Sequence, residues 1–131
     1  MVTTTEVGRL SGECSLWRDT LRSFRQRFTN HQQVLLDVAC NQTNRDILLE
    51  IEHLHNQLHI QLINIHDLKQ LIKKHVGKIK VQRSDPGHLS DDTVGRHNYL
   101  YDEYQSLDTT LHIISRDFDK FVLRIHPFYR N

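Results

Sequence analysis

Apolar residues recur at alternating steps of three and four along three long segments of this chain. This spacing averages 3.5 residues, so each set of apolar residues forms one stripe along one side of an α-helix. A stripe of this kind has to be covered, and the spacing therefore predicts long helices packed side by side. The first stripe comprises Leu10, Cys14, Trp17, Leu21, Phe24, Phe28, His31, Leu35 and Val38.

The second and third segments carry similar stripes. The second has one irregular step around Leu62, which indicates a local stutter. Its predicted members are Ile47, Ile51, Leu54, Leu58, Leu62, Ile65, Leu68, Ile72, Val76 and Ile79. The predicted third stripe comprises Val94, His97, Tyr101, Tyr104, Leu107, Leu111, Ile114, Phe118, Phe121 and Ile125.

Polar and turn-forming residues separate the three segments. Ser11, Thr43 or Asn44, and Ser90 or Asp91 suit the N-cap position, because their side-chain oxygens can accept a hydrogen bond from a free backbone N–H group. The His126–Pro127 pair predicts the end of the third helix, since the residue before proline disfavours the helical conformation. We expect helices over about residues 11–40, 44–82 and 91–125, the last two separated by the loop Ser84-Asp85-Pro86-Gly87.

Three long helices with short connections run up, down and up. Charge supports this topology. The antiparallel order of the first two helices brings the basic end of the second helix, from Lys69 to Lys80, beside the arginines at the start of the first helix. At the other pole, Asp46, Glu50 and Glu52 would face Arg116, Lys120 and Arg124. The sequence predicts a single all-α domain over residues 1–131, an up-down-up antiparallel three-helix bundle with long coiled-coil-like helices.

Charge and hydropathy exclude several partners. The chain has 17 basic and 16 acidic residues and a net charge of +1, so no strong field attracts nucleic acid or an anionic membrane. The basic stretch from Lys69 to Arg83 lacks interleaved aromatic residues and is interpreted as a solvated helix end. No apolar run is long enough to cross a bilayer, and Met1 to Arg9 lacks an apolar signal core. We expect a cytoplasmic protein that binds neither nucleic acid nor membrane.

The two cysteines, Cys14 and Cys40, lie on the same predicted helix. A rise of about 1.5 Å per residue places them roughly 39 Å apart, whereas a disulfide needs Cα atoms within about 7 Å. They cannot bridge within one chain. Two free thiols suit a reducing compartment.

Histidines are frequent, with ten in the chain. His55, His59 and His66 share one side of the second helix, and Glu52 completes a Glu-x-x-His unit with His55. Imidazole and carboxylate groups at this spacing could bind a metal ion in a helical bundle. The ligand set is incomplete, because a di-iron site needs a second Glu-x-x-His unit on another helix. We therefore favour a structural role for these histidines, in which they pack and form hydrogen bonds, over metal binding. We expect no cofactor.

Apolar residues outside the second stripe indicate an interaction surface. Leu49, Ile60 and Ile63 project nearly opposite the predicted core face, with Asn56 between them. A helix that is apolar on two sides lies between two layers, and self-association or a partner helix would supply the second layer. Spacing reveals no nucleophile–base pair, phosphate loop or paired acids, and no small-molecule substrate is identified. We expect a non-enzymatic scaffold or interaction protein that self-associates through this helix, the alternative being a metal-binding bundle that uses Glu52, His55, His59 and His66.

Three motifs in the second and third segments are Glu52-His53-Leu54-His55-Asn56-Gln57-Leu58, Ile65-His66-Asp67-Leu68-Lys69-Gln70 and Arg116-Asp117-Phe118-Asp119-Lys120-Phe121. They resemble motifs of a group of small bacterial cytoplasmic helical-bundle proteins of about this length. That group has no assigned activity, so the resemblance implies a helical fold and a cytoplasmic setting but no function.

Overall fold

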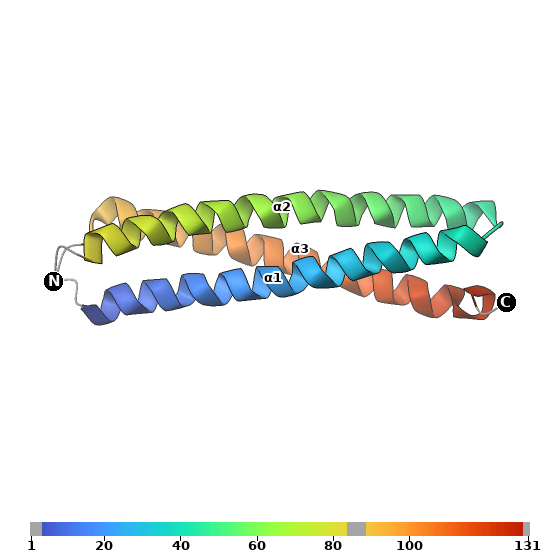
Figure 1. Cartoon of the computed structure of the whole chain (residues 1–131), viewed down its shortest axis with the longest axis horizontal. Coiled ribbons are helices and arrows are strands. Elements are labelled where there is room, and N and C mark those ends of the chain that lie inside the picture. The colour runs from blue at the N-terminus through green and yellow to red at the C-terminus, as the bar shows by residue number, and fades with distance from the viewer. Residues whose placement is uncertain (1–3, 84–88, 130–131) are drawn as a thin grey trace.

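Three long helices form the described part of the chain. The computed structural model describes residues 4–83 and 89–129, and the side chains within 6–82 and 89–125. Helix α1 spans Thr4–Asn41, α2 spans Arg45–Arg83 and α3 spans Asp91–Tyr129. The chain runs along α1, returns along α2 and runs forward again along α3, so α2 is antiparallel to the other two (Figure 1). The predicted all-α three-helix bundle is confirmed. The loop predicted at residues 84–87 lies outside the described residues.

Side-chain caps explain where α2 and α3 begin. The Asn44 Oδ1 atom accepts hydrogen bonds from the backbone N–H groups of Asp46 at 2.9 Å and Ile47 at 3.2 Å. The Ser90 Oγ atom accepts one from the Thr93 N–H group at 3.2 Å. Such caps satisfy backbone donors that have no partner within the helix. Asn44 and Ser90 are therefore the N-caps of α2 and α3. Each was one of the two residues predicted for its position.

Two helix boundaries differ from those predicted. Helix α1 begins at Thr4 rather than near Ser11, because its apolar stripe continues back to the buried Val7. Helix α3 continues beyond Ile125 to Tyr129 and includes Pro127. The conformational preference of a residue before proline is a bias, and one proline in the last turns removes a single N–H donor without ending the helix.

The buried residues follow steps of three and four, and this corrects three assignments. In α2 the steps pass through the buried His75, not through the half-buried Val76, and at the irregular step they pass through Gln61, which is half-buried like its neighbour Leu62. In α3 they pass through Thr93 and Leu100, not through Val94 and Tyr101. Leu100 is fully buried, whereas Tyr101 is 43% exposed. In each case the prediction chose a neighbouring apolar or aromatic side chain over the residue that the spacing required.

Charged side chains of neighbouring helices meet as the antiparallel topology predicts. The Arg124 guanidinium forms an ion pair with the Glu50 carboxylate. Closer to the middle of the bundle, the pKa of Lys69 is lowered, first by partial burial and then by Arg22, Arg25 and Arg18 of α1. The basic groups of α1 and α2 therefore lie side by side, as expected for an antiparallel pair.

Within residues 4–83 and 89–129, none of the helices has the combination of length and apolar composition that would let it cross a bilayer.

The corrected α3 stripe predicts unequal effects of two adjacent substitutions. Leu100→Ala removes a fully buried side chain and should lower the free energy of unfolding by about 2–5 kcal/mol. Tyr101→Ala removes a half-exposed ring and should cost about 1 kcal/mol or less. Urea denaturation followed by circular dichroism measures both, and a larger loss for Tyr101→Ala would contradict this assignment.

Candidate functional site

The outer face of α2 presents the apolar residues that lay outside the predicted core stripe. Leu49, Ile60 and Ile63 are 54%, 53% and 48% exposed, and Asn56 is also exposed. At roughly 100° per residue, these four side chains project within about 60° of one another. They form one stripe on the side of α2 turned away from the buried residues. We call Leu49, Asn56, Ile60 and Ile63 the outer stripe.

The histidines predicted as metal ligands stay apart from one another. Glu52, His59 and His66 are exposed and His55 is half-buried. They share one side of α2, but His59 and His66 are separated by about 10 Å of helix rise. Their ligand atoms are not among those that converge in the described part of the chain. Metal binding by these four residues stays a prediction.

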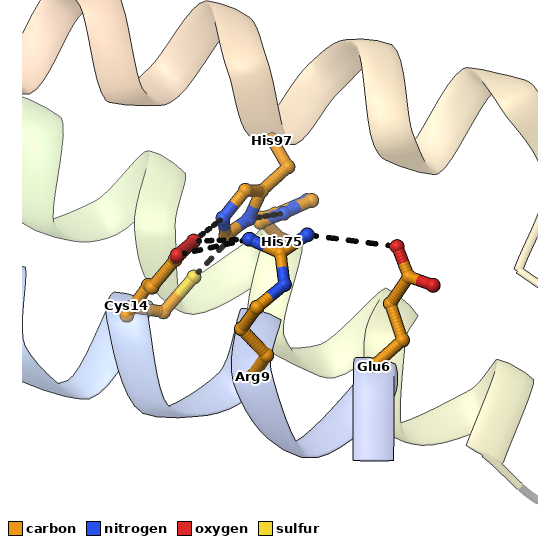
Figure 2. A network of polar contacts seen from close by, with 6 residues as sticks. Glu6, Arg9, Cys14, His75 and His97 are labelled. Atoms are coloured by element: carbon orange, nitrogen blue, oxygen red, sulfur yellow. Dashed lines mark hydrogen bonds and ion pairs between the residues drawn. The ribbon is translucent and has the colours of Figure 1, made fainter. Parts of the chain in front are cut away.

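A different group of ligand-type side chains converges in the core near the N-terminal end of α1. It contains one residue from each helix: Cys14 of α1, His75 of α2 and His97 of α3. All three are buried, and one ligand atom from each lies within 4.8 Å of the others. The Cys14 Sγ atom is 3.8 Å from His97 Nδ1, and His75 Nε2 is 3.0 Å from the same nitrogen. We call these three residues the Cys–His cluster (Figure 2).

A chain of ion pairs extends from the Cys–His cluster to the surface of α1. The His97 Nε2 atom lies 2.9 Å from Glu13 Oε1. The Glu13 carboxylate also accepts hydrogen bonds from the Arg9 guanidinium at 3.1 and 3.3 Å. Arg9 in turn lies 3.5 Å from Glu6, on the side of its guanidinium away from the cluster (Figure 2). The carboxylate of Glu13 is thereby held against the imidazole of His97.

These contacts determine which ring nitrogens carry protons. A carboxylate only accepts hydrogen bonds, so His97 donates from Nε2–H to Glu13 and, when neutral, presents Nδ1 as an acceptor. His75 then donates from Nε2–H to that acceptor. The Nδ1 atom of His75 is buried and has no hydrogen-bond partner among the described residues. Burial, and secondarily His97, Arg96 and Lys78, lower the pKa of His75 from 6.5 to about 4.

The thiol of Cys14 is not an activated nucleophile in this state. Cys14, His97 and the Glu13 carboxylate contact one another in that order, as a cysteine, a histidine and a carboxylate do in some hydrolases. Nucleophilic attack, however, needs a thiolate and access to substrate. Burial, with a smaller contribution from Glu13, raises the pKa of Cys14 to about 11. The Trp17 ring also packs on His97, with 4.8 Å between ring centroids. A protonated, enclosed thiol suits ligand binding or packing better than attack on a substrate.

The spacing of apolar residues in the sequence predicted part of this site. Cys14 and His97 were predicted to lie on the core stripes, and both do. His75 was missed because Val76 beside it is more apolar, although strict steps from Ile72 to Ile79 pass through His75. Glu13 was missed because a half-exposed glutamate beside a stripe is ordinary on a helix surface. No pattern within one helix brings these residues together.

Comparison of this chain with protein-family models, with curated proteins and with solved structures finds no match.

The buried imidazole of His75 predicts a pH-dependent stability. Between pH 6.5 and about 4 the unfolded chain binds a proton at His75 that the folded chain does not bind, so lowering the pH through this range destabilises the fold. The variant His75→Leu lacks this contribution. Its free energy of unfolding, relative to that of the original chain, should therefore increase as the pH falls.

Urea denaturation in metal-free buffer, at several values from about pH 7 down to about pH 4, measures this difference. Gln61→Leu is the matched control, because it also replaces a polar residue of the α2 stripe but removes no titratable group. An equal pH dependence for His75→Leu and the original chain would contradict the assignment.

Proposed function

We propose that this protein is a non-enzymatic helical scaffold that self-associates through the outer stripe of α2. The alignment of Leu49, Ile60 and Ile63 carries the proposal, since each is about half exposed on the same side of one helix. Single exposed apolar residues are common on protein surfaces, but an aligned set is typical of a contact surface. A second copy of the chain would cover this set.

The spacing of the outer stripe fits a symmetric pair. Leu49 and Ile63 each lie seven residues from Asn56, one before it and one after it. Two antiparallel α2 helices related by a twofold axis at Asn56 would place Leu49 of each copy opposite Ile63 of the other. Asn56 would then meet its own counterpart, and a carboxamide both donates and accepts hydrogen bonds. A polar residue at such a position also selects one register, because any shift leaves it unpaired against apolar side chains.

The proposed setting is the cytoplasm. Cys14 and Cys40 are both free thiols, one buried and the other exposed on α1. An exposed free thiol suits a reducing compartment, and the resemblance to small bacterial cytoplasmic bundles points the same way.

Charge placed on the outer stripe should separate the assembly. Ile60→Lys combined with Ile63→Lys would bury two lysines per copy and should weaken association by at least about tenfold, or 1.4 kcal/mol. Sedimentation velocity over a concentration series measures the association, and circular dichroism checks that helicity is kept. Leu16→Lys with Leu123→Lys is the matched control, since both leucines are exposed on the other helices. A monomer at every concentration for the unaltered chain would refute self-association.

A cysteine at position 56 tests the proposed twofold axis. In a Cys40→Ser background, Asn56→Cys should form a disulfide-linked dimer under mild oxidation, because the two thiols would face each other across the axis. Gln70→Cys is the control on the same side of α2. In the proposed pair its two copies would lie roughly 42 Å apart along the helices and should not cross-link. Equal cross-linking at both positions would contradict this register, as would cross-linking at position 70 alone.

A further inference from the structure

We propose that Cys14, His75 and His97 form a binding site in the bundle core for Zn²⁺ or a cation of the same thiolate- and imidazole-preferring class. The site would have three protein ligands, one from each helix, and one open coordination position. It differs from the histidine side of α2 predicted from sequence, and it is independent of self-association through the outer stripe.

The donor set indicates the class of cation. Thiolate and imidazole bind borderline and soft ions such as Zn²⁺, whereas Mg²⁺ and Ca²⁺ prefer oxygen ligands. Zn²⁺ lies about 2.0–2.1 Å from histidine nitrogen and about 2.3 Å from cysteine sulfur. With those bond lengths, the 3.0 Å between His75 Nε2 and His97 Nδ1 corresponds to an angle of roughly 95° at the ion.

The 3.8 Å between Cys14 Sγ and His97 Nδ1 corresponds to an angle of roughly 120° at the ion. The two angles lie on either side of the tetrahedral value that Zn²⁺ adopts. The third separation, between Cys14 and His75, is at most 4.8 Å, and a tetrahedral angle at Zn²⁺ corresponds to roughly 3.6 Å.

Glu13 orients His97 for this role. A histidine that binds metal through one ring nitrogen commonly donates its other N–H to a carboxylate, which sets the tautomer and makes the ligand nitrogen more basic. His97 meets this condition with Nε2 at 2.9 Å from Glu13 and Nδ1 facing the cluster. Arg9 holds the carboxylate in place. Glu13 is therefore a positioning residue.

The proton and charge changes on binding balance. The Cys14 thiol gives up its proton to solvent and bonds the ion as a thiolate, so one proton is released per Zn²⁺. His75 stays neutral, because its proton moves from Nε2 to Nδ1, the buried nitrogen that has no partner among the described residues. One thiolate and the Glu13 carboxylate together offset the two positive charges of the ion. No oxidant or reductant is needed.

A hollow beside His75 offers an approach to the cluster. It has a volume of about 280 Å³, lies between the end of α2 and the start of α3, and is lined by His75, Asp92 and Arg96 among others. A cation, or a small ligand for the fourth coordination position, could enter from this side. Trp17 and Glu13 contact His97, and Glu13 is held by Arg9.

Cobalt spectroscopy on the Cys40→Ser variant tests the site directly. The experiment uses the full chain without an affinity tag, stripped of metal by a chelator. Cys14 is then the sole cysteine and its environment is unaltered, so a sulfur-to-cobalt charge-transfer band on adding Co²⁺ would identify Cys14 as a ligand. We expect that band at one equivalent of Co²⁺, its loss on adding Zn²⁺, and a raised melting temperature with Zn²⁺. No charge-transfer band and no thermal shift would refute the proposal.

Ligand variants in the same background locate the site. Cys14→Ser and His97→Ala should each lower Zn²⁺ affinity at least about tenfold, measured by competition with a chromophoric chelator, with circular dichroism to confirm folding. Glu13→Gln should keep the charge-transfer band but weaken binding about 10- to 100-fold, as expected for a positioning residue. His59→Ala with His66→Ala is the matched control and should bind Zn²⁺ unchanged. Loss of binding in that control with retention in Cys14→Ser would instead place the metal on the exposed side of α2.

Discussion

The burial of one apolar stripe per helix against the other two is the interaction on which the structure depends. Each stripe follows steps of three and four, which keeps its members facing the centre of the bundle over the length of the helix. Long side chains such as Phe28, Leu58 and Phe121 are almost completely enclosed there. Loops and N-caps determine where the helices begin and end, but the matched apolar stripes hold the helices side by side. Substitutions on these stripes therefore act on the whole bundle.

Polar residues interrupt this apolar core at particular levels. His31 stacks on Phe118 with 3.8 Å between ring centroids, and burial lowers its pKa. At the other end, His97 contacts Glu13 of α1 and His75 of α2. A buried polar group is costly unless it is hydrogen-bonded, and these contacts form in only one alignment of the three helices. The Cys–His cluster thus favours one register of α1, α2 and α3, in addition to any ligand that it binds.

The two proposed activities occupy separate parts of α2. The outer stripe runs from Leu49 to Ile63 on the side away from the core, whereas His75 lies further along the helix and faces inward. A scaffold could therefore associate through one surface while an ion stabilised the far end of each bundle. Zn²⁺ bound in the core would join all three helices at the pole where the chain between α2 and α3 begins and ends.

The sequence was sufficient to predict the helices and their antiparallel order from periodicity, two candidate residues for the cap of α2 and of α3, and the acidic and basic groups to which Glu50 and Arg124 belong. These features depend on neighbours in the same helix or on the overall direction of three helices. It was not sufficient at Leu100 and His75. Their apolar or aromatic neighbours, Tyr101 and Val76, were equally plausible on composition, and only the packing of the other helices distinguishes one position from the next.

The sequence by itself thus determined that this chain forms three long amphipathic helices, because a heptad stripe is a local property of each segment. Only the tertiary structure brought Cys14, His75 and His97 within 4.8 Å of one another. The physical reason is register. Residues 14, 75 and 97 meet only when three helices slide to the one alignment that packs their stripes, and no single helix contains that information.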